Sequence, residues 1–113
     1  METIHDYLNK IGEYALLSAE EEQELLPQAA NGNEEALDKI INANLRFIVS
    51  IANQYQNIGL SFLELITASE QGLTNAIMES ASRSLDVRFI QFAVAYMRKA
   101  IEEAIDKQSA LRA

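Results

Sequence analysis

Residues 34–57 read EEALDKIINANLRFIVSIANQYQN, and this stretch decides the fold class. Its apolar side chains recur at intervals of three and four residues, from Leu37 through Ile48 to Tyr55. This spacing places them on one face of an α-helix, whereas a half-buried strand would show strict alternation. Asn33 precedes the stretch at the position of an N-cap. The pattern therefore predicts one long helix over residues 34–57.

Two capping boxes mark further helix starts on either side of this stretch. Ser18 is followed three residues later by Glu21, and Ser61 is followed in the same way by Glu64. In this motif the serine oxygen accepts a backbone N–H of the first turn, and the glutamate accepts the N–H of the serine. The boxes predict helices that begin directly after each serine.

The remaining boundaries are predicted by glycine, proline and polar segments. Gly12 ends a first helix over residues 4–11, and the polar residues 80–86 separate the last two helices. Pro27 removes a backbone donor and clashes with the preceding turn, so the helix after Ser18 is expected to kink or end there. With short connections throughout, we expect an all-α protein, a compact bundle of four to five helices.

The net charge of −8 is concentrated in the first part of the chain. Residues 1–45 carry ten acids and two lysines, whereas residues 46–113 carry seven acids and seven bases. An acidic chain is not attracted to nucleic acid by its overall field, so DNA binding requires a local basic patch. Part of the acidic run, Glu20 to Glu22, also suits the positive end of a helix dipole.

Several classes of protein are excluded by composition. The chain has no cysteine and one histidine, His5, so it lacks a disulfide framework and a cysteine zinc site, and it offers no paired catalytic or metal ligands. No glycine-rich phosphate loop is present. We expect no enzyme activity, no cofactor and no metal. No apolar run reaches the roughly 18 residues of a membrane span, so a soluble, cytoplasmic protein without membrane contact is expected.

The motifs, taken together, resemble the bacterial sigma-70 family of RNA polymerase sigma factors. The resemblance extends over nearly the whole chain and is carried by these segments in order: YLNKIG (7–12), LSAEEE (17–22), GNEEA (32–36), NLRFIVSIA (44–52), LI (65–66), GL (72–73), RF (88–89) and RKAI (98–101). It implies an acidic helical segment over residues 1–32 and a domain-2-like helical bundle over residues 33–113, packed as one unit.

The resemblance also implies two partners. One is core RNA polymerase, bound through the coiled coil of its beta-prime subunit, and the other is promoter DNA, whose flipped −10 bases stack on aromatic rings beside basic groups. The residues that match polymerase-docking positions are Glu64, Leu65, Ile66, Glu70 and Arg46. Those that match DNA-binding positions are Arg88, Phe89, Phe92, Tyr96, Arg98 and Lys99.

Three substitutions depart from the family pattern at these surfaces. Ala68 replaces a glutamate expected to meet a polymerase arginine, Ala95 replaces one of two tryptophans, and Glu103 stands where a basic residue is usual. They favour an alternative function: a degenerate sigma-derived interaction module that no longer melts promoter DNA and binds polymerase, another protein or itself.

The candidate DNA-binding residues also have structural explanations. Helical spacing of Phe89, Phe92 and Tyr96 suits core packing as well as base stacking, and basic residues four positions from acids, such as Arg98 and Glu102, are able to pair along one helix. Apolar side chains on the working surfaces provide a further alternative, a homodimer with a second copy of the chain; these are Ile58, Phe62 and Val87.

Overall fold

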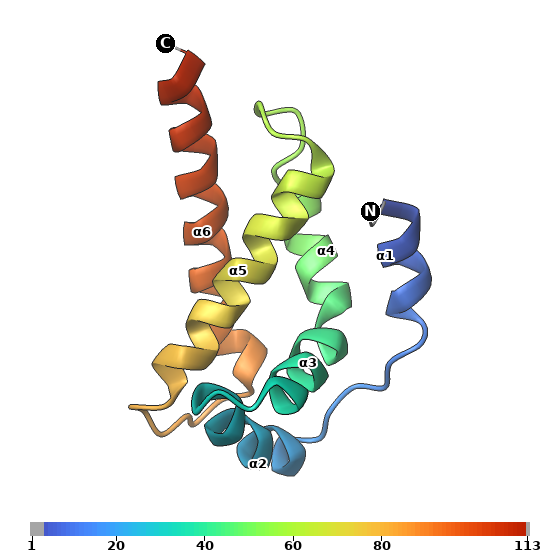
Figure 1. Ribbon diagram of the computed structural model, residues 1–113, viewed down its shortest axis with the longest axis vertical. Helices are drawn as coiled ribbons and strands as arrows, with labels where there is room; N and C mark the ends of the chain where they lie inside the picture. Colours follow the sequence, from blue (N-terminus) through green and yellow to red (C-terminus); the bar gives the residue numbers. More distant parts are fainter. Residues whose placement is uncertain (1–3, 113) are drawn as a thin grey trace.

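The computed structural model describes residues 4–112, and within them it is all-helical (Figure 1). The all-α expectation is confirmed, but six helices are present where four to five were predicted. They are α1 (Ile4–Ile11), α2 (Ala19–Ala30), α3 (Glu34–Ala43), α4 (Leu45–Asn53), α5 (Phe62–Ser80) and α6 (Phe89–Arg112). Residues 1–3 and 113, at the ends of the two expected segments, lie outside the described range.

Both capping boxes are confirmed at the starts of α2 and α5. The backbone N–H of Glu21 donates to Ser18 Oγ at 3.1 Å, and the N–H of Ser18 donates to Glu21 Oε1 at 2.9 Å. The reciprocal bonds between Ser61 and Glu64 measure 3.1 and 2.9 Å. Four otherwise unpaired N–H groups are thereby satisfied, which fixes both helix starts.

The predicted single helix over residues 34–57 is wrong, because Asn44 divides it into α3 and α4. Asn44 lies outside helical geometry, with φ −109° and ψ 11°. Its buried side-chain amide donates to the carbonyl oxygen of Ile40 at 2.7 Å. Its backbone N–H donates to the carbonyl oxygen of Ile41 at 3.0 Å. Asparagine competes with the helical hydrogen-bond pattern in this way. Only one residue leaves the helix, so the apolar periodicity continues across the break and conceals it.

Of the two outcomes expected at Pro27, a kink or an end of the helix, the end is wrong, since α2 continues to Ala30. The proline deprives only the carbonyl of Gln23 of its donor, and Gln23 is exposed to water. The helix extends less than one turn beyond Pro27, to Ala30. The carbonyl of Pro27 itself accepts the N–H of Asn31 at 3.0 Å.

Gly32 then reverses the chain between α2 and α3. Its φ of 98° lies in the region that favours glycine. The N–H of Gly32 donates to the carbonyl oxygen of Ala29 at 3.1 Å, and the N–H of Asn33 donates to the carbonyl oxygen of Gln28 at 3.0 Å. The two bonds together make a Schellman motif. Asn33 Oδ1 in turn accepts the N–H of Ala36 at 3.0 Å, so one turn closes α2 and opens α3.

Helix α5 is the centre of the molecule and packs against α2, α3, α4 and α6. Its buried face and that of α6 form much of the core; fully buried large side chains include Leu65, Ile66, Leu73, Ile77, Phe89, Met97 and Ile101. Helix α2 lies across the end of the bundle at which α6 begins, and α1 lies beside α4 (Figure 1). None of the helices described is long and apolar enough to cross a membrane.

The backbones of α5 and α6 approach each other closely at Gly72. A Cβ atom at this position would lie 2.4 Å from the Cα of Met97 and 2.6 Å from the carbonyl oxygen of Tyr96. From this crossing the two helices diverge towards the start of α5 and the end of α6 (Figure 1). The divergence leaves room between them for a groove.

Candidate functional site

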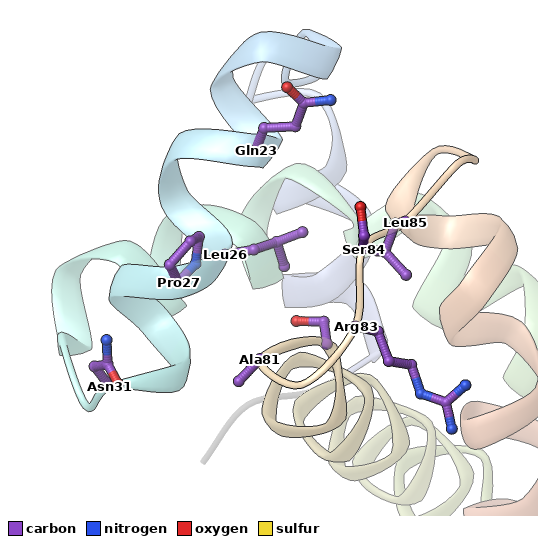
Figure 2. Close-up of a pocket in the computed structure, with 9 residues that line it drawn as sticks. Gln23, Leu26, Pro27, Asn31, Ala81, Arg83, Ser84 and Leu85 are labelled. Carbon is purple, nitrogen blue, oxygen red and sulfur yellow. The ribbon is translucent and has the colours of Figure 1, made fainter.

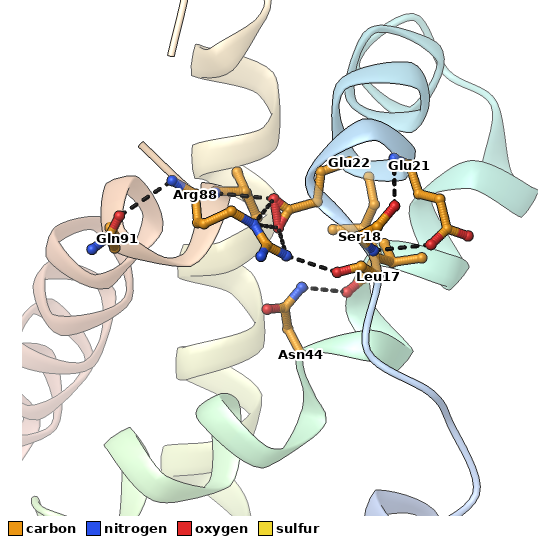
Figure 3. Close-up of polar contacts among 9 residues, drawn as sticks. Leu17, Ser18, Glu21, Glu22, Asn44, Arg88 and Gln91 are labelled. Carbon is orange, nitrogen blue, oxygen red and sulfur yellow. Dashed lines mark hydrogen bonds and ion pairs between the residues drawn. The ribbon is translucent and has the colours of Figure 1, made fainter. Parts of the chain in front are cut away.

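Arg88, a predicted DNA-binding residue, joins α2 to the start of α6 (Figure 3). Its Nε and Nη2 atoms donate to Glu22 Oε1 at 3.0 and 2.9 Å, and Nη2 also donates to the carbonyl oxygen of Leu17 at 2.7 Å. The second carboxylate oxygen of Glu22 accepts the buried backbone N–H of Phe89 at 3.2 Å. The side chain of Glu22 is 11% exposed and that of Arg88 is 49% exposed.

The guanidinium of Arg88 is therefore already hydrogen-bonded to Glu22 and to the Leu17 carbonyl within the fold. Hydrogen bonding to Glu22, and then the charge of this carboxylate, raise the pKa of Arg88 above its usual value. Sequence reasoning missed Glu22, because the helix dipole already explained an acid at this position. Its partner lies 66 positions away, and no local pattern shows a contact of that range.

Of the three aromatic residues predicted to bind DNA, one is buried and two are partly accessible to solvent. Phe89 is 1% exposed and belongs to the core. Phe92 and Tyr96 are partly exposed, with ring centroids 5.1 Å apart and planes inclined at 45°. The guanidinium of Arg83 lies over the Phe92 ring, 5.6 Å from its centroid. The accessible platform is therefore Phe92 with Tyr96.

Arg98 and Lys99 differ in their surroundings. Arg98 Nη1 donates to the hydroxyl oxygen of Tyr55 at 3.3 Å, and its guanidinium lies 5.9 Å from the ring centroid. The same hydroxyl donates to Glu102 Oε2 at 3.0 Å. Tyr55 thus links the segment after α4 to α6, where its hydroxyl bridges the side chains of Arg98 and Glu102. Lys99 is exposed and makes no hydrogen bond or ion pair within residues 4–112.

A small hollow opens where α2, the α3–α4 junction and the start of α6 meet. Its volume is about 180 Å³, and it is lined by Leu16, Leu17, Glu22, Ala43, Asn44, Phe47, Arg88 and Ile90. Apolar walls dominate, with the Asn44 amide and the ion pair between Glu22 and Arg88 as polar groups. Leu16 and Phe47 are exposed large apolar residues of this wall.

The predicted docking residues do not share one surface. Leu65 and Ile66 are fully buried and hold α5 in the core. Glu64 is exposed and also caps the helix, Glu70 is half-buried, and Arg46 is exposed on α4. The side of α5 that faces solvent near its start presents Glu64 together with residues that the prediction omitted, Thr67 and Gln71.

A groove of about 640 Å³ runs beside this exposed side of α5, in the region where α5 and α6 diverge. Its lining comes from the start of α5 and the end of α6: Leu60, Ser61, Leu63, Glu64, Thr67, Ala68, Gln71, Ala104, Lys107, Gln108 and Leu111. The sequence indicated the α5 side of the groove but gave no sign of the α6 side.

A further hollow of about 460 Å³ lies between α2 and the connection that follows α5 (Figure 2). Gln23, Pro27 and Asn31 line it from the side of α2, opposite Ser84 and Leu85. The guanidinium of Arg83 turns away from α2 (Figure 2). The predicted site residues are not among those that line this hollow.

The apolar residues considered for self-association are only partly exposed. Ile58 and Val87 are exposed by about half, at 52% and 51%, whereas Phe62 is half-buried against the core.

Comparison with known proteins places these features in context. Residues 2–35 match the family model described as sigma-70 factor, region 1.2. The chain is also similar to a Bacillus sp. protein named RNA polymerase sigma factor SigA, with 41% identity over 103 residues. The match covers 91% of this chain and 27% of that protein, so the chain spans about a quarter of the length of this curated relative.

Proposed function

The chain belongs to the sigma-70 family of bacterial RNA polymerase sigma factors, and from this premise we propose that it binds core RNA polymerase through the exposed side of α5. The beta-prime subunit is the expected contact, because the resemblance of the α5 sequence to the family's docking helix implies it. Arg46 on α4, which is exposed and has no ion pair within residues 4–112, provides a second contact point.

The observation that carries this proposal is the division of α5 into a buried inner face and a solvent-exposed outer face. Leu65 and Ile66 are fully buried and fix the helix in the core. Glu64, Thr67 and Gln71 are exposed along the opposite side at helical spacing. A protein partner gains most from a surface that needs no reordering on binding. Leu65 and Ile66 act in this proposal as positioning residues that hold the docking surface.

Capture by purified core RNA polymerase tests the proposal, with Thr67→Arg as the disrupting variant. The hydroxyl of Thr67 bonds only to the carbonyl of Leu63 in its own helix, so this substitution spares the fold. Ser82→Arg is a matched control, because its hydroxyl bonds in the same way to Glu79 and it follows the far end of α5. We expect capture of the unmodified chain and of Ser82→Arg, and at least about a tenfold loss for Thr67→Arg. If the unmodified chain is not captured, the proposal is wrong.

A second candidate function is capture of single-stranded −10 DNA. It is favoured by the small hollow beside Asn44 and by the accessible Phe92 and Tyr96 rings, of which Tyr96 lines a surface hollow together with Lys99. Stacking contributes about 1 to 3 kcal/mol per base. Because Arg88 and Arg98 already have partners within the fold, we expect binding to be weak and to disappear with added salt.

Fluorescence anisotropy with a labelled single-stranded −10 oligonucleotide measures this binding. Tyr96→Ala should abolish it, whereas Tyr14→Ala, at an exposed tyrosine outside the hollow and the ring pair, should leave it unchanged. Absence of binding by the unmodified chain at low salt would leave the interaction module, which binds polymerase, another protein or itself, as the function.

A further inference from the structure

We propose that Asn31 is a site of covalent modification by deamidation, at which the side-chain amide converts to a carboxylate when the turn between α2 and α3 opens. Asn31 is the only one of the eight asparagines in the sequence that is followed by a glycine. Asparagine is among the thermolabile residues, and glycine has no side chain to shield its backbone nitrogen. The proposal is independent of the proposed function, because the exposed side of α5 takes no part in this turn.

The reaction consumes only water. The backbone nitrogen of Gly32 attacks the side-chain carbonyl carbon, Cγ, of Asn31, and the new N–C bond closes a succinimide ring. The bond between Cγ and the amide nitrogen breaks, and this nitrogen leaves as ammonia with the proton that Gly32 loses. Water then opens the ring at either carbonyl, which gives aspartate or isoaspartate in place of the asparagine.

The side chain of Asn31 is accessible and carries no competing hydrogen bond. Asn31 and Gly32 are both exposed, and the Asn31 amide makes no hydrogen bond within residues 4–112. Figure 2 shows Asn31 at the turn that ends α2, on the wall of the hollow between α2 and the connection after α5. Apart from the adjoining residues, no described atom lies within 4 Å of the position of a Cβ on Gly32. Water therefore reaches both reacting groups.

The closed turn holds the two reacting atoms apart. Ring closure needs the Gly32 nitrogen on the same side of the Cα–C bond as the Cβ of Asn31. The ψ of Asn31 is 7°, which places that nitrogen beside the backbone nitrogen of Asn31 instead. The Gly32 N–H is also hydrogen-bonded, since it donates to the carbonyl oxygen of Ala29 at 3.1 Å. The Schellman motif must therefore open before the ring forms.

Pro27 weakens the end of α2 at which Asn31 lies. Because proline has no N–H, the last turn of α2 is joined to the preceding turn by one hydrogen bond fewer. Helix ends open locally at a small cost in free energy, whereas a protein core opens only with global unfolding. The turn is therefore expected to open far more often than the whole chain unfolds, and the deamidation rate measures this local opening.

The product is unfavourable for the helix that carries it. The carbonyls at the end of α2 form the negative end of its dipole, and its last turn contains no basic residue. Isoaspartate also lengthens the main chain by its Cβ atom, which changes the spacing of the Schellman bonds. We expect Asn31→Asp to lower the Tm by about 2 to 5 °C. An unchanged Tm would mean that the modification has no structural consequence.

Mass spectrometry of peptides from the full chain, incubated in mildly alkaline buffer, tests the site. We expect deamidation at Asn31, at a rate at least about tenfold below that of the same chain unfolded in urea. Asn57 is the internal control, because it is exposed and followed by isoleucine, and it should remain unmodified. Equal rates in the folded and unfolded chain would overturn the protective role of the turn. Absence of modification at Asn31 in urea would overturn the site.

Two cap variants show whether the opening is local. Asn33→Ala removes the cap of α3 in this turn, where Oδ1 accepts the N–H of Ala36 at 3.0 Å, and Ser61→Ala removes the equivalent bond at the start of α5. We expect Asn33→Ala to raise the deamidation rate of the folded chain about fivefold, and Ser61→Ala to change it by less than about twofold. Equal acceleration by both variants, or no modification of either folded variant, would contradict local opening of the turn.

Discussion

Glu22 accepts hydrogen bonds from two residues of a distant segment, the Arg88 side chain and the buried Phe89 backbone. Removal of this carboxylate leaves a buried N–H without an acceptor, which costs about 1 to 3 kcal/mol. We predict that Glu22→Ala lowers the free energy of unfolding by about 2 kcal/mol, measured by urea denaturation.

The matched control for this prediction is Glu20→Ala, at an exposed residue in the same first turn of α2. It should change stability by less than about 0.5 kcal/mol. Equal effects of the two substitutions would show that Glu22 acts only through the helix dipole and that its contact with α6 has no energetic importance.

We predict that the capping box of Glu21, at the start of α2, makes the stability of the protein depend on pH. Hydrogen bonding from the backbone N–H of Ser18, and then from its hydroxyl, lowers the pKa of Glu21 below its ordinary value of 4.5. A lowered acid pKa gives stability that is present above the ordinary pKa and is lost as the pH falls through the folded-state pKa. Glu21→Gln should therefore lose less stability than the unmodified chain between about pH 5 and about pH 3.

Urea denaturation midpoints over this pH range provide the measurement. Glu24→Gln, at an exposed acid of the same helix, should follow the unmodified chain. A Glu21→Gln curve parallel to that of the unmodified chain would contradict the role of the capping box.

The contact between helices α5 and α6 depends on a single missing side chain. Because a Cβ at residue 72 would lie 2.4 Å from the Met97 backbone, Gly72→Ala forces the two helices apart. We predict a loss of about 3 kcal/mol or more in the free energy of unfolding. Gly12→Ala is the control, because nothing lies within 4 Å of its added Cβ. Thermal unfolding that shows equal stability for the two variants would contradict this account of the crossing.

The helices themselves differ in how well the sequence predicted them. The starts of α2 and α5 were predicted correctly, because a capping box is a local interaction between residues three apart. The break at Asn44 was missed, because one side-chain hydrogen bond to Ile40 interrupts the helix without changing its apolar period. Of the kink or end expected at Pro27, the end was wrong, because the proline removes the donor of one carbonyl only, that of the exposed residue Gln23.

The structure shows which of the predicted site residues are accessible, and the sequence did not show this. The resemblance assigned most of the predicted site residues to the segments that form α5 and α6, but it did not separate the buried ones, Leu65, Ile66 and Phe89, from the exposed ones. Exposure depends on how α5 is turned in the core. The engagement of Arg88 by Glu22, and of Arg98 by Tyr55, depends on tertiary contacts that spacing does not encode.

Over the whole molecule, the net negative charge opposes binding to DNA. The acids of the first 45 residues give the chain its net charge of −8, and Glu103 adds a negative charge to α6. We predict that Glu103→Arg raises the affinity for single-stranded −10 DNA by about threefold to tenfold and steepens its salt dependence, because it restores a phosphate-binding charge.

Fluorescence anisotropy at several salt concentrations measures this gain. Glu13→Arg makes the same charge change at an exposed residue before α2 and should give a much smaller effect. Equal gains from both variants would mean that only net charge matters and that α6 carries no DNA-binding face.

Competition for core RNA polymerase tests the central claim of a shared docking surface most directly. A fluorescently labelled chain is bound to core enzyme, and a full-length relative of the SigA type is titrated against it. The account predicts that the relative displaces the chain, that Thr67→Arg binds at least about tenfold more weakly, and that Ser82→Arg binds and is displaced normally. Simultaneous binding of both proteins, or no binding of the chain to core enzyme, would contradict it.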